Sequence, residues 1–203
     1  MPLPPAAEHR QLKHRRTVDV NVFLRDDALW EVDAHLVDVK TRDTPMAGGI
    51  RRAGAPIHEL TLRLVVDAQL NIVQAGSDSH QVPYAGHCGE HGDAYAALAG
   101  LNLGRGFRHA VMERLGGVRG CTHLSELAQG LPTAVIQGMA GEVIDTRGEG
   151  PDAERPFQID RCHALRSDGE VVRLHHPRWV RRPGTPESAH NPPLEPAAAA
   201  AVP

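Results

Sequence analysis

The stretch His58-Glu59-Leu60-Thr61-Leu62-Arg63-Leu64-Val65-Val66 decides the fold, because apolar and polar residues alternate along most of it. Apolar residues at every second position indicate a half-buried β-strand. Asp67-Ala68-Gln69 then reads as a turn, and residues 70–74 as the returning strand. The stretch therefore predicts a β-hairpin with one face turned toward a core.

The same alternation occurs nearer the N-terminus. Residues 17–24 carry apolar side chains at every second position, and residues 28–40 alternate again. Asp26-Asp27 between them indicates a tight turn, and Gly48-Gly49 marks a loop before the next hairpin. Two hairpins in succession predict an antiparallel sheet of about four strands.

Helical periodicity replaces the alternation after the second hairpin. It appears over residues 94–101 and 107–115, and again from Thr122, which is expected to cap a longer helix. Pro132 is expected to kink or split that helix.

The C-terminal part reads as a closing hairpin. Its strands would be residues 157–166 and 170–174, with Ser167-Asp168-Gly169 as the turn and Cys162 facing the core. The predicted fold class is α+β: an antiparallel sheet built from N-terminal hairpins, packed against a few helices, with a closing C-terminal hairpin.

The predicted domain organisation has three parts. Residues 1–14 form a flexible N-terminus, residues 15–180 a single α+β domain, and residues 181–203 a disordered tail rich in proline and alanine.

Composition excludes several classes of protein. A formal net charge of −3 argues against a nucleic-acid binder, which needs a basic face. No apolar run has the length of a membrane span, and no secretory signal is visible. Three cysteines without a spaced pair fit a reducing compartment, so a cytoplasmic protein is expected. Without a phosphate loop or a GxGxxG motif, no organic cofactor is expected.

The run Gly120-Cys121-Thr122-His123 carries the strongest chemical signal. A thiol and an imidazole lie two residues apart, after a glycine-rich turn and at the start of a predicted helix. Helix N-termini favour thiolate, which makes Cys121 a candidate ligand or nucleophile. The alternative is structural, with Cys121 as a small buried side chain and His123 as an anchor of the turn.

Cys88 extends this signal toward a metal site. It lies in a loop between the second hairpin and the first helix, and such loops often converge on one site. Cys88, Cys121 and His123 would supply three ligands for zinc or iron, and the 13 histidines of the chain favour such a site. A fourth ligand would come from His87, His91 or Cys162.

Asp38 and His58 form a second candidate pair. Each continues the apolar face of its strand, and polar groups on an inward face need partners. If the two strands are antiparallel neighbours, the end of one lies beside the start of the other, and the two side chains meet. An aspartate-oriented histidine is a credible general base, and Lys40, in phase with Asp38, would neutralise an anion. The alternative is that both side chains emerge at the sheet rim in water.

Three stretches in this order resemble a bacterial family, the domain of unknown function 2889. They are Pro56-Ile57-His58-Glu59-Leu60, then the lone Cys88, and then the run from Gly116 to Leu127 that contains GCTHL. The resemblance covers roughly residues 15–180.

The resemblance marks His58, Cys88, Cys121 and His123 as the polar positions that match the family. One departure is that Glu59-Leu60 stands where an acidic residue and methionine would follow the histidine. The resemblance implies no established activity. Similar proteins in soil bacteria with broad aromatic catabolism favour an aromatic substrate.

Three functions are compatible with these residues. The first is a small-molecule enzyme, a lyase or isomerase that acts on a hydroxylated, aromatic-type substrate by acid–base chemistry, including carbon–carbon cleavage. His58, Asp38, Lys40, His123 and Cys121 would be its catalytic residues, and a homodimer its default oligomer. The second is a Cys/His zinc module that acts as a structural scaffold without turnover. The third, ranked last, is a redox-sensing thiol at Cys121.

Overall fold

The computed structural model describes residues 2–150 and 152–181. It confirms the α+β fold class, with an antiparallel sheet from the N-terminal strands and a few helices on it. Residues 2–13 contain no helix or strand, and the first strand begins at His14. Of the predicted tail, only Arg181 belongs to the described residues.

The sheet contains four antiparallel strands in the order β1-β2-β5-β6. They are β1 (His14–Leu24), β2 (Trp30–Lys40), β5 (Pro56–Val66) and β6 (Ile72–Gln81). The two predicted hairpins are therefore both formed, and they pair with each other through β2 and β5. Since β2 and β5 run antiparallel, the end of β2 lies beside the start of β5.

The chain between β2 and β5 forms a separate, short two-stranded ribbon. It consists of β3 (Thr44–Met46) and β4 (Gly49–Arg51), with the predicted loop at Gly48-Gly49 as its tip.

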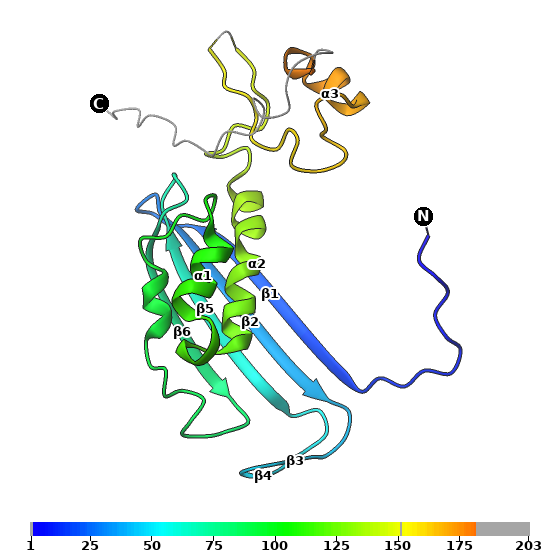
Figure 1. Cartoon of the computed structure of the whole chain (residues 1–203), viewed down its shortest axis with the longest axis vertical. Helices are drawn as coiled ribbons and strands as arrows, with labels where there is room; N and C mark the ends of the chain where they lie inside the picture. The colour runs from blue at the N-terminus through cyan, green and yellow to red at the C-terminus, as the bar shows by residue number, and fades with distance from the viewer. Residues whose placement is uncertain (1, 151, 182–203) are drawn as a thin grey trace.

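Helices cover one face of the sheet (Figure 1). The chain passes from β6 through the 3₁₀ turn η1 (Ala94–Leu98) to α1 (Phe107–Leu115). A second turn, η2 (Gly117–Arg119), leads into α2 (Thr122–Met139), which contacts β1, β2 and β5. Helix α2 therefore packs across β1, β2 and β5.

The start and continuity of α2 differ from the sequence prediction. Cys121, not Thr122, is the N-cap residue, with extended backbone angles and no side-chain capping hydrogen bond. Pro132 does not split the helix, which continues to Met139. The apolar stripe of α2 has its predicted spacing and packs on the sheet, and this packing outweighs the backbone hydrogen bond lost at proline.

The core lies between the sheet and the helices. Strand alternation turns the even-numbered residues of β2 and β5 toward α1 and α2, where burial of apolar surface drives the packing. The largest fully buried side chains of this layer are Leu36, Leu60, Leu62, Leu64, Ile72, Tyr95, Leu98, Leu124, Leu131 and Met139.

The predicted closing hairpin is wrong. Residues 157–166 contain turns, and Glu170–His175 is the helix α3, followed by the turn η3 (Pro177–Trp179). Glu170 lies in the first turn of α3 and basic residues lie in its last turn, which is the arrangement that the helix dipole favours. The apparent alternation over five residues was too short to distinguish a strand from a helix.

A tight local turn replaces the first strand of that hairpin. The Asp160 carboxylate accepts a hydrogen bond from the backbone N–H of Ser167 at 2.7 Å, and Asp160 has a left-handed φ of 63°. Cys162 is therefore exposed and does not face the core as predicted.

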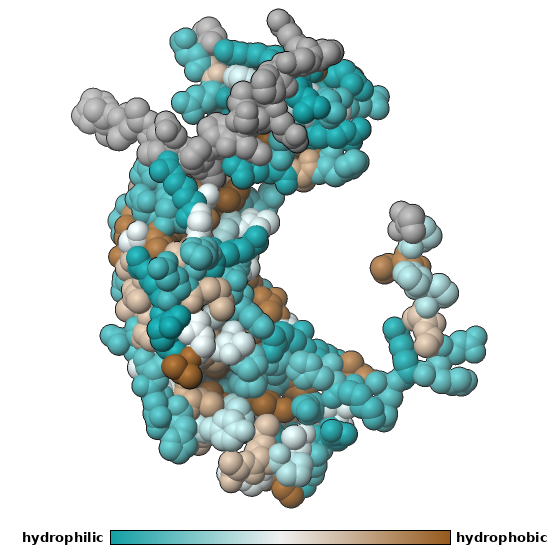
Figure 2. Space-filling view, viewed as in Figure 1, coloured by the Kyte–Doolittle hydropathy of each residue, from teal (hydrophilic) through white to brown (hydrophobic). Residues whose placement is uncertain are grey.

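The C-terminal segment with α3 follows the far end of α2 (Figure 1). An α-helix of 18 residues is about 27 Å long, so this segment is remote from the N-terminus of α2. In Figure 2 the surface of this segment is mainly hydrophilic, and apolar residues on the visible face are scattered. Within the described ranges no helix is both long and apolar enough to cross a membrane.

Candidate functional site

The candidate site is centred on Asp38, near the end of β2. In the strand register Asp38 is paired with Arg16 of β1 on one side and with His58 of β5 on the other. All three side chains therefore lie on one face of the sheet, the face that α2 covers. The expectation that Asp38 and His58 meet at one end of the sheet is confirmed.

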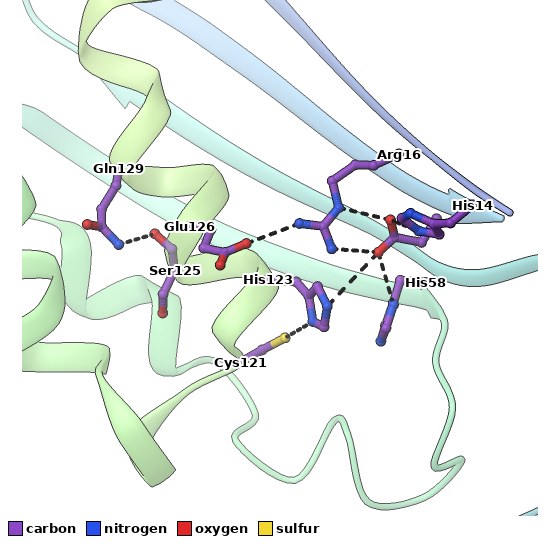
Figure 3. A network of polar contacts seen from close by, with 9 residues as sticks. His14, Arg16, His58, Cys121, His123, Ser125, Glu126 and Gln129 are labelled. Carbon is purple, nitrogen blue, oxygen red and sulfur yellow. Dashed lines mark hydrogen bonds and ion pairs between the residues drawn. The ribbon is translucent and has the colours of Figure 1, made fainter. Parts of the chain in front are cut away.

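The Asp38 carboxylate is buried, with 4% of its side chain exposed, and it accepts four hydrogen bonds. Oδ1 accepts from Nε2 of His14 at 2.8 Å and from Nε of Arg16 at 2.9 Å. Oδ2 accepts from Nη2 of Arg16 at 2.8 Å and from Nδ1 of His58 at 3.2 Å. Figure 3 shows His14 and Arg16 from β1, and His58 from β5, converging on this carboxylate.

These donors keep Asp38 ionised. Burial alone would raise its pKa, but the hydrogen bonds and charge of Arg16, followed by those of His14, lower the pKa to about 2. The pKa of Arg16 is raised mainly by its hydrogen bonds with Asp38. Arg16 also donates a hydrogen bond to Glu126 of α2 at 3.1 Å, so it connects the edge strand β1 to this helix.

The contact with Asp38 fixes the tautomer of His58. Because Asp38 is an anion, Nδ1 of His58 must carry the proton in their hydrogen bond, and Nε2 is left with its lone pair. Burial, and next the charge of nearby His123, lower the pKa of His58 below its ordinary value, although Asp38 opposes this. His58 is therefore neutral at neutral pH and able to accept a proton at Nε2.

A second imidazole lies against the first. The rings of His58 and His123 have centroids 3.9 Å apart and are tilted by 35°. Nε2 of His123 is 4.0 Å from Oδ2 of Asp38, so both imidazoles point a nitrogen at the same oxygen. A positive charge on His123 at this separation would oppose protonation of His58.

Cys121 reaches the site from the N-terminus of α2. Its Sγ is 3.9 Å from Nδ1 of His123. The backbone of Cys121 is held by the buried Tyr95 hydroxyl, which donates to the Cys121 carbonyl at 2.7 Å and accepts from the Cys121 N–H at 3.1 Å. Ser125 Oγ lies 2.9 Å from the same hydroxyl.

Gly120 permits this approach, and its replacement gives a testable prediction. A Cβ at position 120 would lie 2.9 Å from the carbonyl oxygen of Leu115 and 3.0 Å from the Tyr95 hydroxyl. We expect Gly120→Ala to lower the free energy of unfolding by about 1–3 kcal/mol, as overpacking does, in a denaturant titration. Gly130→Ala is the matched control, because nothing lies within 4 Å of that exposed helix position. Equal stability of the two variants would show that residue 120 has room to move.

Lys40 and Cys88, which were also predicted for the site, make no side-chain contact with Asp38 among those that the structure describes. Lys40 is half-buried at the end of β2, opposite His14 in the register, and it forms no ion pair within the described part of the chain. Cys88 is half-buried in a turn that its backbone N–H closes onto the carbonyl of Tyr84. The structure does not bring Cys88 together with Cys121 and His123 in a group of possible ligands.

The group of possible metal ligands found among the described residues is a different one. Asp38, His58 and His123 each offer one atom, and these atoms lie within 4.8 Å of one another. However, both oxygens of Asp38 already accept hydrogen bonds, so a cation would have to displace a donor. Proton transfer requires no such displacement. The expected zinc or iron remains a prediction.

Sequence reasoning missed His14, Arg16 and Glu126. The sequence did carry a signal for the first two, because His14 and Arg16 lie four and two positions before Val18, in phase with the valines of β1. The strand predicted from residue 17 begins three residues later than β1, so it leaves out both His14 and Arg16. Nothing local in the sequence could indicate the contact of Glu126 with Arg16.

The fold and the site together define an α+β protein in which one layer of helices covers an antiparallel sheet and a buried carboxylate is surrounded by imidazoles. The chain belongs to the family described as Protein of unknown function (DUF2889), whose model matches residues 14–137. This confirms the resemblance to the family, although the match ends at residue 137 and not near residue 180 as expected. Every residue of the Asp38 site lies in the matched part. Neither the curated proteins nor the solved structures include a significant match to the chain.

Proposed function

We propose that the protein is an acid–base enzyme of the lyase or isomerase type, which acts on a small hydroxylated molecule without an organic cofactor. The observation that carries this proposal is the 3.2 Å hydrogen bond from Nδ1 of His58 to the buried Asp38 carboxylate. It fixes the tautomer of His58 and leaves Nε2 as the proton acceptor. A general base oriented by a carboxylate is a recurring catalytic device.

The second imidazole completes a proton cycle. His58 accepts a proton from the substrate at Nε2, and Asp38 stabilises the imidazolium that forms. His123, whose ring lies against that of His58, takes over this proton and returns it to the product, so that only one of the two imidazoles is protonated at a time. Groups with different environments in one site support opposite roles as acid and base.

In a carbon–carbon cleavage, His58 removes the proton of the substrate hydroxyl group. The electron pair of the broken O–H bond forms a carbonyl, and the adjacent carbon–carbon bond breaks. Its electron pair stays on the departing fragment, which takes a proton from His123. A departing carbon attached to an aromatic ring would spread the developing negative charge into the ring, so a hydroxylated aromatic molecule would suit this step.

Arg16 and Lys40 have separate roles in this scheme. Arg16 is engaged by Asp38 and Glu126, so its charge holds the base in place and is not free for the substrate. Lys40, half-buried at the same end of the sheet, would supply a cation for an anionic oxygen of the substrate.

A panel of hydroxylated aromatic compounds in deuterated water tests the proposal. With purified protein and no added cofactor, we expect at least one compound to be cleaved or isomerised with solvent deuterium at the carbon that loses its bond. Mass spectrometry and NMR of the products measure this incorporation. A reaction that required added nicotinamide, flavin or nucleotide, or that left no solvent deuterium on carbon, would contradict the proposal.

A further inference from the structure

We propose that Cys121 is a nucleophile activated by His123 and oriented through Asp38, and that its thiol adds to an aldehyde carbonyl carbon. The identity of the electrophile rests on the proposed function, because a carbon–carbon lyase acting on a hydroxylated carbon releases a carbonyl compound. The reactivity of the thiol rests on geometry alone and is tested separately.

The three groups form a line through the imidazole ring. The distance from Cys121 Sγ to Nδ1 of His123 is 3.9 Å, and Nε2 on the other side of the ring is 4.0 Å from Oδ2 of Asp38. At 4.0 Å the carboxylate acts on His123 by its charge and not by a hydrogen bond. This charge favours a proton on Nε2, and Nδ1 would then accept the thiol proton. A nucleophile, a base and a carboxylate in this order define the activated-cysteine arrangement. Such contacts are often long before a substrate binds and shorten in the complex.

The thiol is held in place by its own backbone. The hydroxyl of fully buried Tyr95 contacts both the N–H and the carbonyl of Cys121, and Ser125 holds that hydroxyl in turn. Gly120 admits this contact where a Cβ would collide. A reactive group whose supporting residues are locked by packing keeps its geometry, which is a requirement for nucleophilic catalysis.

The other two cysteines provide a built-in comparison. Cys88 has the same intermediate burial as Cys121, and Cys162 is exposed. Accessibility alone would make Cys162 react fastest. A higher reactivity of Cys121 would therefore report activation rather than exposure.

The chemical step is an addition that needs no oxidant or reductant. The thiol proton moves to Nδ1 of His123, and the sulfur electron pair forms a bond with the carbonyl carbon. The carbonyl π electrons move to oxygen, which takes the proton from His123, so the product is a neutral thiohemiacetal. The backbone N–H groups in the first turn of α2 lack intrahelical acceptors and follow Cys121 directly in the chain. They would stabilise the carbonyl oxygen as its negative charge develops.

Competitive alkylation of the native full chain tests the activation of the thiol. Limiting iodoacetamide at pH 7 is followed by peptide mass spectrometry, which gives a separate rate for each cysteine. We expect Cys121 to react roughly tenfold or more faster than Cys88 and Cys162. His123→Asn should remove this advantage, whereas the control His163→Asn, next to exposed Cys162, should leave it unchanged.

The carbonyl step is tested with ¹³C-labelled acetaldehyde and NMR. We expect a new tetrahedral carbon signal in the wild type that Cys121→Ser lacks. If Cys121 reacts no faster than the other cysteines, the nucleophile is overturned, even where His58-dependent turnover persists and the proposed function stands. Fast alkylation without an aldehyde adduct overturns the carbonyl assignment. Circular dichroism of each variant verifies that it is folded.

Discussion

Replacement of His58 by glutamine is expected to lower turnover by about 10²–10⁴-fold, the range for loss of a general base. Glutamine retains a hydrogen-bonding side chain of similar length but cannot accept a proton at neutral pH. Because the wild-type base must be neutral to act, the rate should rise with pH through the pKa of His58, which lies below its ordinary value of 6.5. Steady-state rates measured across this pH range test both points.

His35→Gln is the matched control for this variant. His35 also lies in the sheet, on β2, but its side chain is on the opposite face, near Glu59 at 3.7 Å. We expect the control to retain wild-type turnover. If His58→Gln retained full activity while folded, or if both variants lost activity equally, His58 would not be the base.

The second large effect concerns the Asp38 carboxylate and acid stability. The pKa of Asp38 falls from its ordinary 3.8 to about 2 in the folded protein. The ionised form is therefore favoured by folding, and its contribution of about 2 kcal/mol is present above the unfolded-state pKa. As pH falls below about 4 and through the folded-state value, this contribution is lost. Asp38→Asn should be less stable than wild type at pH 7 by about 2 kcal/mol and should lack this part of the acid dependence.

Denaturant titrations between pH 2 and pH 7 measure this difference. The partners Arg16 and His14 have side chains 35% and 43% exposed, so water can solvate them once the carboxylate is gone, which limits the loss. Asp33→Asn is the control. Its ion pair with Arg63 lies on the other face of the sheet, where such a pair contributes about 0–1 kcal/mol. Parallel stability curves for wild type and Asp38→Asn would show that the carboxylate gains nothing from its donors.

The sheet and one pair of the site were accessible from the sequence for the same physical reason. Strand alternation assigns a face to every residue, so Asp38 and His58 could be placed inward before their strands were paired. Antiparallel pairing of neighbours then put the two residues together, and the register confirms it. The inference depended only on a period of two and on the order of the strands.

The remainder of the site depends on tertiary packing. The periodicity of α2 shows which of its faces is buried, but not where its first residue lies along the sheet. The enzyme hypothesis put Cys121 and His123 in one site with Asp38 and His58, but the contact of His123 with Asp38 could not be derived from the sequence. The convergence of Cys88 with them was inferred from loop position alone, and a loop position fixes no direction for a side chain. The closing hairpin failed because five residues of weak alternation are compatible with either helix or strand.

β1 is an edge strand, paired on one side only, yet it supplies two of the three side chains that donate to Asp38. Local opening of such a strand is less costly than opening of a central one, because fewer hydrogen bonds and contacts are lost. If β1 detaches, the carboxylate keeps His58 but loses the cationic partner that most lowers its proton affinity. The basicity of the Asp38–His58 pair is thus set by the attachment of β1, and any event that loosens or secures this edge changes how readily the centre takes up a proton.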